Sequence, residues 1–342
     1  MTRAMWLFTL ATLTPVALIV AAALLGRPWT WAALAYMSVL AFALDEIIRV
    51  VTPAEDAGRE FPAADMLSVA LALSHFGLLA VSVWALAGEW LDAGEKLALF
   101  FAAGWFFGQV SNSNAHELIH RGSRALHLLG KWVYITMLFG HHTSAHPLVH
   151  HIHVATDKDP NSARLGETYY RFLMRAWIGS FRAGLKAESA RLARIGAPAW
   201  RNPYLVYVGG AVFFLALALT LGGGPALLWM LALCGFATSQ LMLSDYVQHY
   251  GLRRSMRDNG KPEPVGDRHS WNAPHWFTSG LMLNAPRHSD HHAHPARPYP
   301  ALRLDADMPT LPRSLPVMGA LALFPSAWRR VMDPRVRAVQ CT

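Results

Sequence analysis

The histidines in the middle of the chain are the residues whose spacing most clearly indicates chemistry. His116 and His120 lie four residues apart in HELIH, directly after a long apolar run. On a helix this spacing places both imidazoles on one face, one turn apart, and neutral imidazole is a common metal ligand. The same residues match the H-E-x-x-H pattern of zinc proteases, in which Glu117 acts as general base. HELIH alone therefore indicates a metal site without identifying the metal.

More histidines follow in short clusters, and the chain has 17 in all. The candidate ligands among them are His146, His150 and His151 in HHTSAHPLVHHIH, His249 in DYVQHYGL, and His288, His291 and His292 in RHSDHHAH. On a regular helix His146 and His150 share a face while His151 points away, which favours two metal ions over one. The spacing i, i+3, i+4 of the last three fits one arc of a helix.

The number of candidate ligands exceeds the three or four protein ligands of a single zinc ion, so we expect two metal ions. Imidazole binds Fe, Cu, Zn and Ni alike, so ligand type does not choose the metal. Glu117, Asp245 and Asp290 stand beside candidate ligands. They either orient the rings through hydrogen bonds or cap helices and pair with arginines. Metal transport is a weaker alternative because few ionisable residues, chiefly His75, lie inside the apolar runs.

The elements that must position these histidines are membrane helices. The chain is 53% hydrophobic and 15% charged, whereas soluble domains average roughly 25% charged residues. Long apolar runs predict about six transmembrane helices, near residues 5–25, 29–48, 66–87, 96–115, 204–221 and 225–244. We therefore expect an all-α integral membrane protein that forms a single membrane domain over residues 1–342.

The basic residues predict the orientation of this domain. With six spans, 28 of the 30 lysines and arginines lie on one side, and only Arg27 and Lys96 lie on the other. The positive-inside rule assigns the basic side to the cytoplasm. This distribution explains the net charge of +8 without nucleic acid as a partner. All the histidine clusters lie on the same side, in the polar segments 116–203 and 245–342.

Three apolar stretches in the polar segments are too short or too mixed to be further spans. Residues 126–140 predict a buried or interfacial helix, and the patch at 315–328 a packed or interfacial segment. Residues 169–194 combine apolar side chains with regularly placed arginines, which predicts an amphipathic helix. That helix lies either on the membrane surface or against the protein's own polar part.

The ordered motifs resemble those of the membrane alkane hydroxylases, which belong to the fatty-acid desaturase/hydroxylase superfamily of integral-membrane diiron proteins. The resemblance rests on HELIHR, on H-x-x-x-H-H followed by VATDKDPNSARLGE, and on DYVQHYGL, RHSWN and RHSDHHAHP, from about His116 to Pro300. An H-Y-G box after the last span is typical of the hydroxylase branch. The second box departs from the family's usual E-H-x-x-G-H-H at Ala145 and Val149, which bears on the shape of the substrate pocket.

The resemblance implies a bacterial-type inner-membrane monooxygenase that hydroxylates the terminal carbon of alkanes or similar hydrophobic chains with dioxygen. It implies two non-haem iron ions held by His116, His120, His146, His150, His151, His249, His288, His291 and His292. Electrons would come from a separate rubredoxin or ferredoxin with its reductase, since two cysteines, Cys234 and Cys341, cannot build a four-thiolate centre. Hydroxylation of an aromatic methyl group and desaturation of an acyl chain remain alternatives, and an intramembrane zinc protease is a more distant one.

Overall fold

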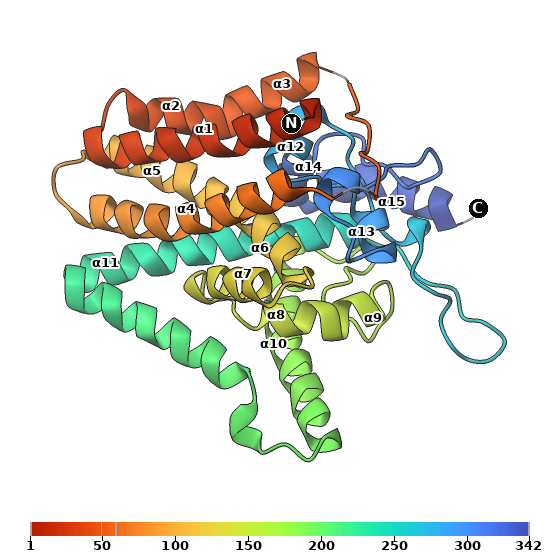
Figure 1. Ribbon diagram of the computed structural model, residues 1–342. Coiled ribbons are helices and arrows are strands. Elements are labelled where there is room, and N and C mark those ends of the chain that lie inside the picture. Colours follow the sequence, from red (N-terminus) through yellow and green to blue (C-terminus); the bar gives the residue numbers. More distant parts are fainter. Residues whose placement is uncertain (1, 49, 59, 341–342) are drawn as a thin grey trace.

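The computed structural model describes residues 2–48, 50–58 and 60–340, so Cys341 lies outside the described residues. The secondary structure of this part is helical, and its only β pairing consists of two isolated bridges. Figure 1 shows long helices side by side at one end of the molecule and short helices with loops at the other. The prediction of an all-α architecture is confirmed.

The N-terminal half consists of long apolar helices. It comprises α1 (Arg3–Leu25), a second helix made of α2 (Trp29–Ala35), the π-helical turn η1 (Tyr36–Leu40) and α3 (Ala41–Ile47), and α4 (Pro62–Ala87). Short turns follow α1 and α4, and a longer connection joins α3 to α4. A capping box starts the next helix, because Asp92 accepts from the Glu95 amide at 2.9 Å and Glu95 accepts from the Asp92 amide at 3.0 Å.

The predicted span at 96–115 lies in one continuous helical path that leads directly to HELIH. It consists of α5 (Ala93–Trp105), the π-helical turn η2 (Phe106–Ser111) and α6 (Asn112–Ile119). Two glycines let this path pack closely on α11 (Tyr204–His249). A Cβ atom at Gly104 would lie 2.5 Å from the Phe236 ring, and one at Gly108 would lie 2.5 Å from Nε2 of Gln240. The path is therefore held in one position against α11.

Helix α11 has 46 residues and bends at Gly223, whose φ of 67° and ψ of −163° suit glycine. The bend divides α11 into two arms, in the place of the hairpin predicted around residues 222–224. Four helices of the described chain are long and apolar enough to cross a membrane: Arg3–Leu25, Trp29–Ile47, Pro62–Ala87 and Tyr204–His249. The α5–α6 path is not among them, since η2 and α6 carry polar residues such as Gln109 and Asn112. The number of spans stays a prediction.

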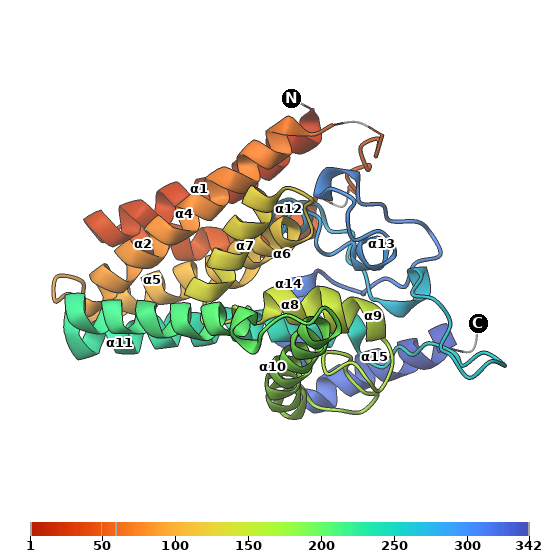
Figure 2. The same ribbon diagram turned by 60° about the horizontal axis from the view of Figure 1, so that its bottom comes forward.

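The turns and the chain ends lie at opposite ends of the molecule. In Figures 1 and 2 the α1–α2 turn, the α4–α5 turn and the bend of α11 lie at one end. Both chain ends and the short helix α13 (His288–Ala293) lie toward the other. This arrangement brings the polar segments together beyond one end of the long helices.

The polar segments pack onto the long helices and onto one another. Their helices are α7 (Arg124–Thr136), α8 (His142–Ala145), η3 (His146–His150), α9 (His151–His153), α10 (Tyr169–Arg194), α12 (Trp276–Leu281), α13, α14 (Leu315–Ala322) and α15 (Pro325–Gln340), with short 3-10 turns at Ala199–Arg201, Asp267–His269 and Tyr299–Ala301. The predicted helices at 126–140 and 169–194 correspond to α7 and α10. Buried Phe172, Ala176 and Gly184 pack α10 against α8, η3 and α11, so α10 lies against the protein's own polar part.

Candidate metal centre

All nine histidines identified from the sequence come together in two adjoining groups. The first group contains His116, His120, His146, His151 and His291, and the second contains His150, His249, His288 and His292. Within each group, one nitrogen of every ring lies within 4.8 Å of the others. The rings come from α6, from η3 and α9, from the end of α11 and from α13. Four segments that are far apart in the sequence therefore converge on one place.

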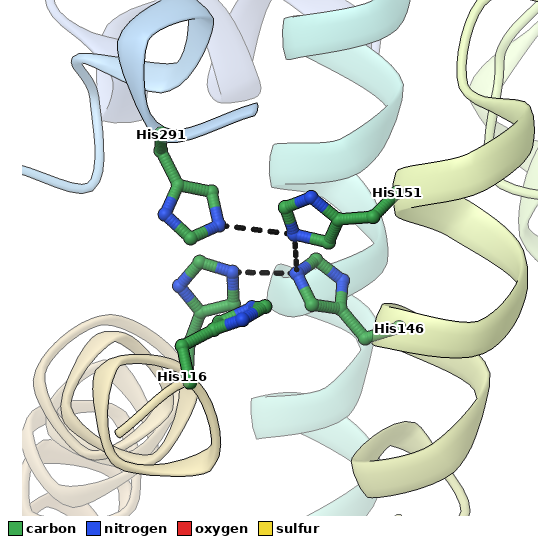
Figure 3. A group of neighbouring side chains, drawn as sticks. His116, His146, His151 and His291 are labelled. Carbon is green, nitrogen blue, oxygen red and sulfur yellow. Dashed lines mark hydrogen bonds between the residues drawn. The ribbon is translucent and has the colours of Figure 1, made fainter. Parts of the chain in front are cut away.

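In the first group, the ring nitrogens of His116, His146, His151 and His291 point toward one another (Figure 3). Nε2 of His146 lies 2.7 Å from Nε2 of His116 and 2.9 Å from Nε2 of His151. Nε2 of His291 lies 3.1 Å from Nε2 of His151. The Nε2 atom of His120 is buried and has no hydrogen-bond partner among the described residues. The Nε2 atoms of this group therefore point into one small volume.

The second group repeats this pattern. Nε2 of His288 lies 3.0 Å from Nε2 of His249 and 3.1 Å from Nε2 of His292. The ring of His150 lies near two of the other rings, with centroid distances of 4.7 Å to His249 and 4.8 Å to His292. Its Nε2 atom is buried without a partner in the described part of the chain.

Hydrogen bonds between the rings cannot satisfy these nitrogens. A ring nitrogen of a neutral imidazole offers either one proton or one lone pair. Nε2 of His146 nevertheless faces two other Nε2 atoms, and so does Nε2 of His288. Two nitrogens that bind one ion at about 2.1 Å and at right angles lie about 3.0 Å apart, as these pairs do. The residues present therefore fit two metal ions, one in each group.

A π-helical turn decides which histidine joins which group. On a regular helix His151 would point away from His146, and this expectation is wrong: their ring centroids lie 4.5 Å apart, while His146 and His150 are also neighbours at 5.1 Å. His146–His150 form the π-helical turn η3, whose wider turn brings residue i+5 near residue i. His151 therefore meets His146 in the first group, while His150 turns toward the second.

Helix α13 is a regular α-helix, and its spacing divides its histidines between the two groups. His288 and His292, four residues apart, both belong to the second group, and His291 points to the first. Asn272 of the RHSWN motif holds the start of this short helix, because its Oδ1 accepts from the Ser289 amide at 3.0 Å and its Nδ2 donates to Oγ of Ser289 at 2.8 Å. The RHSWN motif thus positions α13, the helix that carries His288, His291 and His292.

The three carboxylates proposed to orient the rings have other partners. Glu117 accepts from the Tyr299 amide at 3.3 Å and lies 3.5 Å from Arg121. Asp245 accepts from Nδ2 of Asn161 at 2.6 Å. Asp290 accepts from the backbone amide of Arg303 at 2.8 Å and pairs with His294 and Arg297. Of these contacts, the pairing of Glu117 with Arg121 and that of Asp290 with Arg297 correspond to the alternative of pairing with arginines.

The acid that does contact a candidate ligand is Asp159, which the sequence reasoning missed. Nδ1 of His150 lies 2.8 Å from Oδ2 of Asp159, and both side chains are buried. The same carboxylate also accepts from Oγ of Ser162 and from the Asn161 amide. The available signal was the turn-forming DPNS directly after the second cluster, where aspartate commonly accepts from backbone amides.

Burial sets the charge of the rings. Desolvation and the neighbouring rings hold the pKa values of His116, His146 and His291 well below the ordinary value. These rings are neutral and keep the lone pair that binds a metal. Burial also lowers the pKa of His150, but the Asp159 carboxylate outweighs it and leaves that pKa raised. His142, outside both groups, is buried and stacks on His146 with ring centroids 4.7 Å apart.

Two adjoining cavities lie beside the histidine groups. An outer cavity of about 440 Å³ is lined mainly by apolar side chains, among them Met37, Phe101 and Trp105. A smaller inner cavity of about 30 Å³ is lined by residues that include His116, His142, His146 and His288. Ser244, Met282 and Leu315 line both cavities. The outer, mainly apolar cavity therefore adjoins the histidine-lined cavity at these three residues.

Comparison with known proteins agrees with the resemblance. The family model for fatty acid desaturases matches residues 96–321. Alkane 1-monooxygenase 2 from Pseudomonas aeruginosa is 34% identical over 321 residues, covering 91% of this chain and 85% of that protein. Alkane 1-monooxygenase 1 from Alcanivorax borkumensis is 34% identical over 288 residues, covering 84% and 70%. The hydroxylase component of xylene/toluene monooxygenase from Pseudomonas putida is 26% identical over 322 residues, covering 91% and 84%.

The match to the family model begins in α5 and ends in α14, so it includes all nine histidines of the two groups. The alkane 1-monooxygenases match the chain at 32% to 36% identity. The chain therefore belongs to the fatty acid desaturase family and, within it, groups with the alkane 1-monooxygenases.

Proposed function

We propose that the chain is a membrane-bound non-haem diiron monooxygenase that hydroxylates the terminal carbon of alkanes or of similar hydrophobic chains. The observation that carries the proposal is the convergence of nine imidazoles, in two groups, at the inner end of an apolar cavity. The named relatives, which are alkane 1-monooxygenases, support this choice of reaction.

Each histidine group would hold one iron ion. Bound iron supplies the activation of dioxygen that is needed to attack a C–H bond without polar neighbours. In the overall reaction one oxygen atom enters the C–H bond as hydroxyl and the other leaves as water. The second product requires two electrons and two protons from outside the substrate.

The chain itself binds and orients the substrate. An alkane has no polar group to recognise, so its position must be fixed by the shape of an apolar site. The outer cavity suits the body of such a chain, and the boundary at Met282 and Leu315 admits its end to the inner cavity beside His116 and His146. The packed helices around the inner cavity also limit the access of water.

Electrons would arrive from a separate rubredoxin or ferredoxin with its reductase. Rubredoxin and ferredoxin centres are held by about four cysteine thiolates, and the chain has two cysteines in all. Cys234 is buried among the helices, where its thiol donates to the Thr136 carbonyl at 3.4 Å.

We further propose six transmembrane passes in a bacterial-type inner membrane, with the histidine groups at the cytoplasmic side. The excess of lysine and arginine in 116–203 and 245–342 supports this orientation. The start of α1 and the end of α15 lie toward the same end of the molecule (Figures 1 and 2), which supports an even number of passes. The hydrocarbon would then reach the outer cavity from the bilayer, and electrons would reach the histidine end from the cytoplasm.

Iron analysis combined with turnover tests the proposed function. The protein is purified, its metals are counted, and it is supplied in proteoliposomes with rubredoxin, the reductase, NADH and either octane or hexadecane. We expect about two irons per chain and a 1-alkanol product detected by gas chromatography. A single zinc ion per chain, or unchanged alkane with a competent electron donor, would reject the proposal.

A second candidate is hydroxylation of an aromatic methyl group. The similarity to the xylene/toluene monooxygenase component over 91% of the chain favours it. The same reconstituted system supplied with xylene separates the two candidates, since a benzylic alcohol formed much faster than 1-octanol would favour the second. A product with a carbon–carbon double bond would instead indicate desaturation.

A further inference from the structure

Helix α10 packs on the protein with one face only, and large apolar side chains are exposed on another face. These side chains are Tyr170, Met174, Ile178 and Leu185, of which Met174 is 62% exposed. Because an α-helix turns by about 100° per residue, the four fall within about 80° around the helix axis. They therefore form one continuous row, which we call the apolar stripe of α10.

Basic side chains lie along one edge of the apolar stripe. Arg171, Arg182 and Lys186 are exposed, and on a regular helix they fall within about the next 80° around the axis. Glu188, the only acidic residue of α10, is buried and pairs with Arg191. The three basic side chains therefore have no exposed acid of their own helix beside them. An apolar stripe with a basic edge is typical of a helix that lies in the headgroup region of a membrane.

The C-terminal end of α10 leads directly to a membrane helix. Residues 195–203 connect it to α11, which is one of the helices long and apolar enough to cross a membrane. Trp200 in this connection is 69% exposed, and Cζ of Arg201 lies 5.3 Å from the centroid of its ring. Tryptophan and basic residues at the end of a span mark the membrane–water interface. We therefore place this end of α10 at the level of that interface.

The N-terminal end of α10 adjoins a second exposed apolar segment. Oη of Tyr170 donates to the Leu323 carbonyl at 2.8 Å, and both Leu323 and Phe324 are exposed directly after α14. Figure 1 shows α10 running across the direction of α4 and of the second arm of α11. With the long helices crossing the bilayer, α10 runs along its surface, from the end of α14 to the start of α11.

The combination of an apolar stripe and a basic edge favours a lipid surface over an acidic protein as the partner. A bilayer accepts apolar side chains at the boundary of its acyl chains, and its anionic headgroups attract lysine and arginine. The exposed apolar side chains of the α11 arm that follows, such as Leu205 and Phe213, continue the same environment. The chemistry recognised is the phosphate of a phospholipid whose headgroup has a net negative charge, such as phosphatidylglycerol.

The packed face of α10 supports a segment that carries metal ligands. A Cβ atom at Gly184 would lie 2.9 Å from Cβ of Ala145, the residue directly before His146. Glu188 accepts from Oγ of Ser144 at 2.7 Å, and both side chains are buried. A displacement of α10 would therefore displace the beginning of η3, which supplies ligands to both histidine groups.

From these contacts we infer that the exposed side of α10 binds the anionic headgroups of the surrounding bilayer, and that this binding stabilises the two histidine groups through η3. Arg182 and Lys186 are the phosphate-binding residues, and the apolar stripe inserts beside them. The inference rests on the membrane placement in the proposed function, and it is independent of the substrate.

The position of the apolar stripe is tested with a fluorescent label in nanodiscs that hold one protein each. Cys341→Ser leaves buried Cys234 as the remaining thiol, and Ile178→Cys then accepts the label. We expect quenching by nitroxide-bearing lipids and protection from acrylamide in water. Phe213→Cys, on the exposed arm of α11, is the control for lipid. Asp258→Cys, in an exposed loop, is the control for water.

The effect of lipid charge is tested by timing the loss of bound metal to a chelator. Nanodiscs contain either phosphatidylcholine alone or equimolar phosphatidylcholine and phosphatidylglycerol. We expect phosphatidylglycerol to slow the loss from wild-type protein roughly fivefold, the effect of about one basic side chain at an anionic surface. Arg182→Gln combined with Lys186→Gln should abolish this difference. Arg257→Gln combined with Lys261→Gln removes the same charge from an exposed loop and should keep it.

The outcomes decide the inference separately from the function. A lipid-quenched label at residue 178, together with loss of the lipid effect in the α10 double variant alone, supports it. A label quenched from water like the one at residue 258, an equal lipid effect in both double variants, or no effect in wild type overturns it. If added rubredoxin shields a water-exposed label at residue 178, the surface belongs to the electron donor and the inference is likewise overturned. Neither measurement requires turnover, so unchanged alkane would reject the proposed function without altering these results.

Discussion

At the scale of single residues, the geometry of Nε2 atoms carries the metal assignment. His146 and His288 each direct one ring nitrogen toward two others, an arrangement that fits a metal ion between the rings. Asp159 supports the same assignment, because its contact with Nδ1 of His150 leaves Nε2 as the nitrogen that faces the second group. Such a carboxylate fixes the ring orientation and increases its basicity as a ligand.

Asp159→Asn should therefore weaken the second metal site. Loss of this kind of contact typically costs 10- to 100-fold in metal affinity or activity. We expect iron to fall from about two toward about one per chain, with turnover reduced at least tenfold, as measured by metal analysis and product formation. Asp157→Asn is the matched control, since Asp157 is 81% exposed and pairs with Arg253. Normal iron content and turnover in Asp159→Asn would contradict the role of this carboxylate.

At the scale of elements, two local devices position the ligands. The π-helical turn η3 directs His151 to the first group and His150 to the second. Gly130 of α7 allows close approach to α6, where a Cβ atom would lie 2.7 Å from Cβ of Leu118 and 2.9 Å from the Ala115 carbonyl. The close packing of α7 against α6 therefore holds the two histidines of HELIH in position.

Because of the geometry of η3, we expect substitution of the two histidines of α9 to affect iron content and turnover differently. His151→Ala should remove a ligand of the first group and lower the iron content by about one ion with loss of turnover. His153→Ala should retain both, because His153 belongs to neither group. Iron counts on the two purified variants check the prediction, and equal iron in both would contradict the grouping.

Gly130→Ala should displace α6 and with it the first ligand pair. Overpacking of this kind costs about 1–3 kcal/mol. We expect a lower melting temperature in detergent and reduced iron content. Gly122→Ala is the control, since a Cβ atom there meets nothing within 4 Å. If both variants melt alike and carry equal iron, close α6–α7 packing does not position the site.

At the scale of the whole molecule, the histidine groups join segments that are remote in the sequence. Each group takes ligands from segments before and after α10, so bound metal would cross-link the end of α6, the η3–α9 segment, the end of α11 and α13. Metal that binds the folded state and not the unfolded chain stabilises the folded state by mass action.

Removing the metal should therefore destabilise the end of the molecule that contains α13 more than it destabilises the long helices. We expect chelation to lower the melting temperature, to increase proteolysis of the segment 245–310, and to be reversed by Fe(II) under anaerobic conditions. Melting curves and limited proteolysis of the metal-free and reloaded protein provide the measurement. Identical curves with and without iron would show that the metal does not tie these segments together.

The sequence by itself determined the chemical class of this protein. Apolar runs and imidazoles are local properties, so the composition indicated a helical membrane protein and the clusters indicated all nine histidines that the structure brings together. Only the tertiary structure decided how those histidines divide, because a π-helical turn leaves no mark on the hydrophobic periodicity. It also placed Asp159, rather than Glu117, Asp245 or Asp290, within hydrogen-bond distance of a candidate ligand ring. Hydrogen-bond partners depend on distances between folded segments, and those distances are fixed by packing.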